Sequence, residues 1–205
     1  MRSYKQHSLA FAVSCALALL PALLVAPRAR AQGGRGRGPM AVMTLTSPAF
    51  QNGGVIPVKQ SQAGHDVSPA LSWTAVPDSN VVSFVLIVHD VNAPIGNGVD
   101  DMLHWMAWNI PGSARSLPEG VGHDPQMPDG SRQISATGPY YRGPAAPSTG
   151  PMHNYVFELY ALDTMLEIPA VGAQPPATRA AVMAAVAGHV RGKAALVGQF
   201  RRAAP

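Results

Sequence analysis

Three apolar runs along this chain place a strong limit on how it can fold. The first, Ser83–His89, contains the unbroken segment Phe84–Val88, which is apolar on both faces of an extended chain. Such a run suits a strand buried inside a sandwich core rather than one that faces water. Two further long apolar runs follow, the second of them rich in aromatic and β-branched residues, and the sequence therefore predicts a mainly β core. These runs are Leu103–Ile110 and Asn154–Leu162.

Shorter strand-like segments and turn residues fill most of the remaining chain. Gly and Pro number 20 each, which matches the many turns of an all-β fold. Residues 120–150 carry few strand signals and form a long, loop-rich insertion, and insertions of this length often line a functional site. The shorter strands are expected at Met43–Leu45, Val55–Val58, Ala70–Thr74 and Ala194–Phe200.

One helix is expected near the end of the chain. Thr178 is a candidate N-cap for an alanine-rich segment that runs from Arg179 to Ala187. Gly188 is placed to end this helix in a left-handed conformation. Apolar residues at helical spacing predict one face directed toward the core, and they are Val182, Met183 and Val186.

The N-terminus has the pattern of an export signal over residues 1–31. Arg2 and Lys5 precede the apolar stretch Leu9–Ala26, and Ala29-Arg30-Ala31 supplies a small-x-small cleavage pattern. A transmembrane anchor is the alternative, but Pro21 and the cleavage-like end argue against it. We therefore expect a periplasmic or secreted protein that has no stable membrane anchor once the signal is removed. Residues 32–42 are predicted to be a flexible Gly/Arg leader, and residues 43–205 a single domain.

Removal of the signal also changes the charge and the chemistry of the chain. Four of the 15 basic residues lie in the signal, so the remainder balances the 11 acidic residues. The basic pI is then no argument for binding nucleic acid. The single cysteine, Cys15, leaves with the signal, which excludes disulfides and Cys-based metal sites from the mature chain. No cofactor is expected.

Polar and titratable residues gather where the apolar strands end. Asp90 follows a fully apolar strand, and a carboxylate at that position requires partners. His104 lies inside an apolar run. His153 and Tyr155 are two residues apart, so they project from one face of a strand, roughly 6–7 Å apart. The segment that begins at Arg142-Gly143-Pro144 leads into this strand.

From strand geometry alone, two interpretations of these residues remain open. They can form one joint site, or each can be structural. In the second case Asp90 caps a turn and His104 is a buried histidine bonded to a backbone carbonyl. A metal site of His104, His153 and Asp90 is allowed by residue type, but the spacing gives no positive signal for it.

Four stretches together resemble the phosphatidylethanolamine-binding protein family, in its bacterial Raf-kinase-inhibitor-like branch. Their order and spacing are more specific than any single motif, and the resemblance covers about residues 43–201. The stretches are Ser68-Pro69-Ala70-Leu71-Ser72-Trp73, Asp90-Val91-Asn92-Ala93-Pro94, His104-Trp105-Met106-Ala107-Trp108-Asn109-Ile110-Pro111, and Gly143-Pro144 leading to His153-Asn154-Tyr155.

The resemblance implies a Greek-key β-sandwich with one or two peripheral helices and a small pocket at one end. It implies that this pocket binds phosphate or similar anions, including phospholipid head groups. By motif position, Asp90 resembles the pocket aspartate, His104 and His153 the two pocket histidines, and Tyr155 the neighbouring aromatic. Gly143 and Pro144 resemble the pocket wall. The chain departs from the usual motif at three positions that bear on the ligand, namely Val91, Asn92 and Asn154.

Three functions follow as hypotheses. The first is a non-enzymatic binding module for a small anion or phospholipid head group, which also docks on a protein partner as a kinase- or protease-inhibitor-like protein. The second is a hydrolase in which His104 or His153, oriented by Asp90, activates a water molecule. The third is a stable exported domain whose pocket has no ligand.

Overall fold

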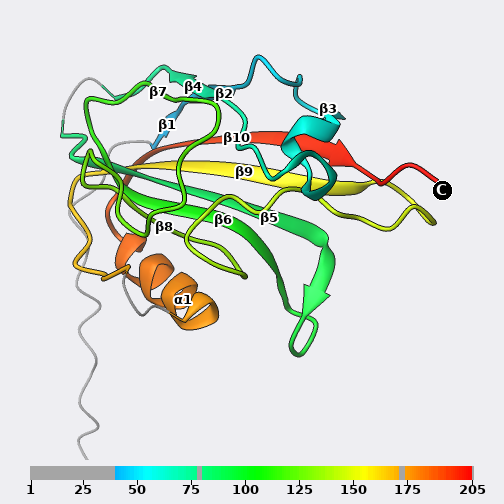
Figure 1. The fold of residues 1–205 in the computed structure, drawn as a ribbon. Coiled ribbons are helices and arrows are strands. Elements are labelled where there is room, and N and C mark those ends of the chain that lie inside the picture. The colour runs from blue at the N-terminus through cyan, green and yellow to red at the C-terminus, as the bar shows by residue number, and fades with distance from the viewer. Residues whose placement is uncertain (1–39, 78–79, 171–173, 205) are drawn as a thin grey trace, which may run out of the picture. The chain divides into compact units, whose positions relative to one another are not determined.

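The computed structural model describes residues 40–77, 80–170 and 174–204, so the predicted signal and most of the leader lie outside the described residues. Within them the chain forms ten strands, one α-helix and two short 3-10 helices (Figure 1). The helices are η1 (Val58–Gln60), η2 (Gln62–Gly64) and α1 (Pro175–Val186). The strands are β1 (Ala41–Val42), β2 (Thr44–Thr46), β3 (Gly54–Val55), β4 (Leu71–Thr74), β5 (Ser83–Ile95), β6 (Asp100–Pro111), β7 (Ser116–Leu117), β8 (Arg132–Ile134), β9 (His153–Leu162) and β10 (Val190–Phe200).

The strands form two sheets. The larger sheet has the order β1-β10-β9-β5-β6-β8, with β3 also paired to β10, and the smaller sheet has the order β2-β4-β7. Strands β5, β6 and β8 follow one another through antiparallel pairs, and β9 then returns to pair with β5 on its other side. The resulting spatial order β9-β5-β6-β8 is that of a Greek key. The predicted mainly β fold with a peripheral helix is confirmed.

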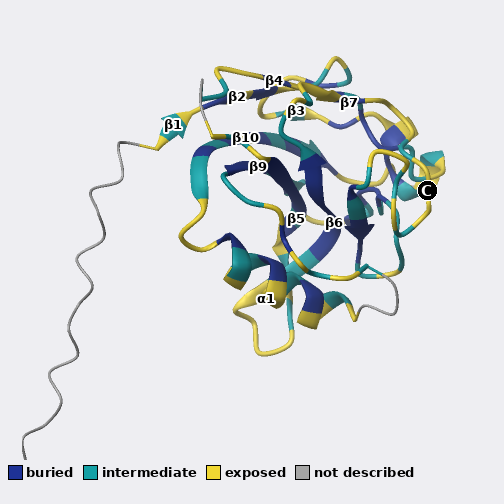
Figure 2. Cartoon of the chain, turned by 90° about the vertical axis from the view of Figure 1, so that its left-hand side faces the viewer, coloured by how far each residue is buried: buried dark blue, intermediate teal, exposed yellow. Residues whose placement is uncertain are grey.

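Two apolar clusters explain why β5 is apolar on both faces. Phe84, Leu86 and Val88 pack with Trp73 of β4, between the two sheets. The alternate residues Val85 and Ile87 point the other way, where α1 covers the large sheet. Figure 2 shows this arrangement as dark central strands between the β2–β4 layer and α1. Since side chains alternate along a strand, only a run that is apolar throughout can satisfy both clusters.

Several elements differ in extent from those that the sequence predicts. Pairing begins at Ala41, two residues before the expected start of the domain at Met43. The strand expected at Val55–Val58 ends after Val55, since Pro57 has no N–H for a ladder and η1 follows. Residues 120–150 also contain β8, which pairs with the middle of β6.

The helix α1 begins earlier than predicted. Pro175 and Pro176 occupy its first turn, where a missing N–H costs no hydrogen bond. Thr178 is therefore inside the helix and is buried, with its backbone N–H bonded to the carbonyl of Gln174. The predicted stop at Gly188 is confirmed by its φ of 90°.

A carboxylate on β6 ties α1 to the β5–β6 hairpin. Asp101 Oδ2 lies 2.5 Å from His89 Nδ1, and Asp101 Oδ1 accepts from Arg179 Nη1 of α1 at 2.7 Å. Burial raises the pKa of Asp101, but the hydrogen bonds and charges of His89 and Arg179 outweigh burial and lower it below its ordinary value of 3.8. The ionised Asp101 carboxylate therefore stabilises the fold at pH values above its ordinary pKa. This stabilisation is lost as the pH falls through the lowered pKa.

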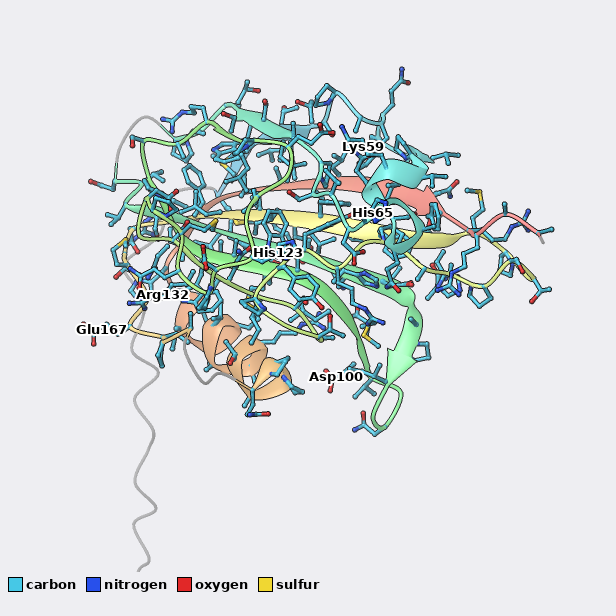
Figure 3. The ribbon with its side chains drawn as sticks, in the orientation of Figure 1. Lys59, His65, Asp100, His123, Arg132 and Glu167 are labelled. Carbon is cyan, nitrogen blue, oxygen red and sulfur yellow. The ribbon has the colours of Figure 1, made fainter. Side chains whose placement is uncertain are left out.

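Asp101→Asn is expected to reduce the free energy of unfolding by about 1 kcal/mol near neutral pH, because it removes the charge that His89 and Arg179 share. The variant should also lose less stability than the wild type on acidification below the ordinary carboxyl pKa. Urea unfolding at about pH 7 and about pH 3 measures both effects. Asp100→Asn is the matched control, since Asp100 is the exposed neighbour at the hairpin (Figure 3). Equal pH dependence of the wild type and Asp101→Asn would contradict this account.

Candidate functional site

A small pocket lies where β5, β6 and β9 meet the loop that follows Tyr141. Its volume is about 170 Å³, and it brings together residues from five separate parts of the chain. The loop packs against η1 and η2. In Figure 3, Lys59 marks η1, and His65 marks the end of η2. The lining residues are Gln62, Asp90, Ala93, Met102, His104, Arg142, Ala145, Ala146, Pro147, His153 and Tyr155.

Asp90 is the buried carboxylate of the pocket, with only 3% of its surface exposed. It lies opposite Tyr155 in the β5–β9 ladder, which places His153, two residues before Tyr155, on the same side. Asp90 Oδ2 lies 2.8 Å from His153 Nδ1, and Asp90 Oδ1 accepts from the backbone N–H of Asn92 at 2.9 Å. The hydrogen-bond partners that a buried carboxylate requires are therefore present, and His153 and the backbone of Asn92 supply them.

Tyr155 lies beside the Asp90–His153 pair and is almost fully buried. Its hydroxyl oxygen accepts from the backbone N–H groups of Ala145 and Ala146, at 3.3 and 3.2 Å. Burial raises the pKa of Tyr155, and the negative charge of Asp90 raises it further. The phenol is therefore a neutral group that fixes the loop at residues 145–146, and it consumes two backbone donors in doing so.

His104 approaches the pocket from β6 and packs edge-on against the Tyr155 ring, with centroids 5.0 Å apart. Its Nδ1 lies 2.7 Å from the carbonyl oxygen of Arg142. A carbonyl only accepts, so Nδ1 carries the hydrogen and Nε2 of the neutral ring carries a lone pair. Burial lowers the pKa of His104, against the opposing effects of the Arg142 carbonyl and the Asp90 charge. His104 is therefore held as a neutral ring of one tautomer.

Gly143 and Pro144 lie behind the lining rather than on it. The Gly143 N–H donates to Asp66 Oδ1 at 2.8 Å, and its carbonyl accepts from Gln62 Nε2 at 3.0 Å. The Pro144 carbonyl accepts from the backbone N–H of Gln62 at 3.1 Å. Both residues are buried, and they hold the loop against η2 so that Arg142 and Ala145 face the pocket.

Arg142 is the main lining residue that reasoning from the sequence does not select. Its backbone carbonyl fixes His104, and its guanidinium Nη1 lies 3.2 Å from Met102 Sδ. It is thus the permanent positive charge among the lining residues. The position of Arg142 directly before Gly143-Pro144 is a sequence signal that it belongs to the pocket. Gln62 is far from the other lining residues in the sequence, and no such signal marks it.

The two asparagines that depart from the usual motif bond to each other beside the pocket. Asn92 Oδ1 accepts from the backbone N–H of Asn154 at 2.7 Å and from its Nδ2 at 3.1 Å. Gln199 Nε2 donates to Asn154 Oδ1 at 3.1 Å. This neutral amide chain joins the end of β5 to β9 and β10 without adding a charge to the pocket.

Comparison with known proteins identifies the family. The model of the family described as phosphatidylethanolamine-binding protein matches residues 46–201. The chain belongs to the phosphatidylethanolamine-binding protein family. A UPF0098 protein of Methanothermobacter thermautotrophicus is 40% identical over 162 residues, which cover 78% of this chain and 99% of that protein. LppC of Mycobacterium tuberculosis, whose name describes it as a candidate lipoprotein, is 34% identical over 77% of this chain and 72% of its own length.

A solved structure of the family has the same fold. The phosphatidylethanolamine-binding protein homologue CT736 of Chlamydia trachomatis superposes with a TM-score of 0.64 at 32% identity. The match covers 78% of this chain and 98% of the chlamydial chain. The Greek-key sandwich predicted from the resemblance is therefore the fold of this phosphatidylethanolamine-binding protein family member.

Two searches of the described part of the chain concern membranes and metals. Within residues 40–77, 80–170 and 174–204, no helix is both long and apolar enough to cross a membrane. No group of three or more His, Cys, Asp or Glu side chains in those residues is arranged to hold a metal ion. Of the three residues that residue type allowed as ligands, Asp90 bonds His153 and His104 bonds a backbone carbonyl.

Proposed function

We propose that this chain is an exported binding protein whose pocket takes a small anion, either phosphate or a phosphate ester such as a lipid head group. The observation that carries the proposal is the convergence of Arg142, His104 and His153 on one cavity of about 170 Å³. A guanidinium binds phosphate oxygens in a fixed fork, and a volume of this size admits a small head group only. Export is supported by the signal-like N-terminus and by the lipoprotein name of the mycobacterial relative.

Binding is favoured over hydrolysis by the residues of the pocket. The described lining contains no serine, threonine or cysteine that could act as a nucleophile. Its one hydroxyl belongs to Tyr155, which is bonded to two backbone N–H groups and whose pKa is raised by burial. Asp90 is placed to orient His153 as a general base. Hydrolysis would in addition require a water molecule that this base activates. We therefore place the pocket among binding sites.

The pH dependence of binding tests this proposal. Protonation of His153 would add an Nε2–H donor and a positive charge beside Arg142, while Asp90 holds its Nδ1. We expect calorimetric titration with inorganic phosphate and with phosphoethanolamine to show saturable binding that strengthens from about pH 7.5 to about pH 5.5. His153→Ala should weaken binding at the lower pH about tenfold or more, since it removes a charge-assisted hydrogen bond.

His189→Ala is the matched control for this titration. His189 Nδ1 lies 2.8 Å from Asp163 Oδ1, the same pairing as in His153–Asp90, but His189 is exposed and lies outside the pocket. The His189→Ala variant should bind inorganic phosphate and phosphoethanolamine as the wild type does. Absence of binding at both pH values would overturn the anion pocket and leave docking on a protein partner as the better hypothesis. Turnover of a phosphoester, lost in His153→Ala, would instead favour the hydrolase.

A further inference from the structure

The C-terminal tail of the chain, residues 201–204, leaves the sandwich beside the anion pocket. Phe200, the last residue of β10, lies opposite His153 in the β9–β10 ladder. The backbone N–H of Arg202 donates to the carbonyl of Ala146 at 3.1 Å, and Ala146 lines the pocket. Figure 1 accordingly shows the C-terminus at the end of the large sheet where β9 begins. The tail is therefore held at the edge of the pocket.

The loop at residues 145–152 lies next to the tail and carries no charged residue. Arg201 Nη1 donates to the carbonyl of Gly150 at 2.7 Å, which fixes the first side chain of the tail to this loop. Pro147 and Pro151 are exposed and have no backbone N–H, so a surface that covers them leaves no donor of theirs unpaired. The two segments, residues 145–152 and residues 201–204, are together the pocket rim.

The pocket and its rim carry three arginines. Arg142 lines the pocket, and Arg201 and Arg202 are exposed on the tail. Neither residues 142–157 nor residues 201–204 contain an aspartate or a glutamate. Since an arginine keeps its charge throughout the physiological range of pH, this side of the pocket is permanently positive.

Acidic residues of the neighbouring elements do not lie on the rim. Asp90 is almost fully buried at the bottom of the pocket and is bonded there. Asp66 accepts from the backbone N–H of Gly143, behind the lining. Asp100 and Asp101 line a separate cavity beside α1. The exposed charge of the rim is thus positive.

From this arrangement we infer that the pocket rim docks on a bilayer that contains anionic lipids, so that the phosphate in the pocket belongs to a lipid and not to a free anion. The inference rests on the anion pocket proposed above and names the surface that supplies its ligand. A cavity of about 170 Å³ holds a head group only, and the acyl chains of such a lipid remain in the bilayer. The rim must therefore lie against the bilayer surface while the head group is bound. Each of the two tail arginines then adds about fivefold to the affinity for an anionic bilayer.

Sedimentation with lipid vesicles tests the inference. The form used begins at Met40, because the apolar N-terminal segment would itself enter lipid. The chlamydial relative, 98% of whose chain is covered by the match, consists of the domain alone and folds without such a segment. Vesicles of phosphatidylethanolamine and phosphatidylglycerol should bind about tenfold or more tightly than vesicles of phosphatidylcholine. Binding should weaken as the salt is raised from about 0.05 M to about 0.3 M, since exposed charges are screened.

Competition shows whether the lipid phosphate enters the pocket. Saturating phosphoethanolamine should release the protein from the anionic vesicles, because one pocket cannot hold two head groups. Sodium chloride at equal ionic strength should release less. Equal release by the two would show that the protein is held by its surface charge alone, and would overturn the inference.

Substitution of the tail arginines identifies the docking residues. Arg201→Gln should weaken binding to the anionic vesicles about fivefold, and the double variant with Arg202→Gln about 20-fold or more. Arg115→Gln is the matched control. Arg115 is likewise exposed and its Nη1 donates to the carbonyl of Gly112 at 2.9 Å, but it follows the far end of β6, away from the pocket. The control should bind within about twofold of the wild type.

The outcomes separate the docking surface from the anion pocket itself. Equal affinity of the wild type for the two kinds of vesicle would overturn the inference, as would an equal loss in Arg115→Gln and Arg201→Gln. Binding of soluble phosphate without binding of any vesicle would assign the pocket to free phosphate. That result would also overturn the inference, but it would leave the proposed function intact. Absence of all binding would instead defeat the proposed function.

Discussion

Gly143→Ala is expected to lower the free energy of unfolding by about 3 kcal/mol and to abolish anion binding. A Cβ at this position would lie 2.4 Å from the carbonyl oxygen of Gln60 and 2.7 Å from the carbonyl carbon of Ser61. Both are backbone atoms, so no change of rotamer can make room. The loop would have to move away from η1 and η2. The hydrogen bond that Gly143 N–H donates to Asp66 would be lost, as would the one that its carbonyl accepts from Gln62.

Denaturant unfolding and phosphate titration of the same variant measure the two parts of this prediction. Gly122→Ala is the control, because a Cβ there meets no atom within 4 Å. It should change the free energy of unfolding by less than about 0.5 kcal/mol and leave binding unchanged. If Gly143→Ala were as stable as the wild type, the close contact of the loop with η1 and η2 would be wrong. If it were less stable but bound phosphate normally, the loop would not shape the pocket.

Gln133→Ala should destabilise the protein by about 3–4 kcal/mol through the long loop between β7 and β8. The Gln133 side chain is fully buried, and its Oε1 accepts from Trp105 Nε1 at 2.8 Å. Its Nε2 donates to the carbonyls of Gly122 and Asp124, at 2.6 and 2.9 Å. Removing the amide leaves an indole N–H and two carbonyls without these partners, together with a cavity.

Urea unfolding followed by tryptophan fluorescence measures this loss, because Trp105 reports directly on its environment. Gln126→Ala is the matched control from the same loop, since the Gln126 side chain is exposed. The control should lie within about 0.5 kcal/mol of the wild type. A similar small change in Gln133→Ala would mean that water replaces the amide at all three partners.

The parts of the fold that the sequence predicts well are those in which burial dominates. Strands β5 and β6 are largely apolar on both faces because their side chains enter two clusters, one against the smaller sheet and one against α1. Strands β7 and β8 have only two and three residues, so their apolar pattern is too short to read. They exist because β4 and β6 present partners at the right place, which is a property of the tertiary fold.

The same division applies to the pocket. Asp90, His153 and Tyr155 come together because the β5–β9 ladder sets their positions, and strand periodicity was enough to place two of them on one face. Arg142 reaches the pocket from a loop and Gln62 from η2, and their positions depend on contacts such as Gly143 N–H to Asp66. Reasoning from strands therefore finds the carboxylate and the histidines, but not the guanidinium on which anion binding is proposed to depend.

The return of β9 to pair with β5 has a consequence for the order of events in folding. The pocket draws on η2, β5, β6 and β9, so it is complete only when segments from Gln62 to Tyr155 have met. Contacts between residues so distant in the sequence form late and slowly, because long loops must first be closed. A ligand held there contacts only the finished sandwich. A bound ligand therefore stabilises the protein by slowing its unfolding. It does not speed folding, so an unfolded chain must complete its core without help from the ligand.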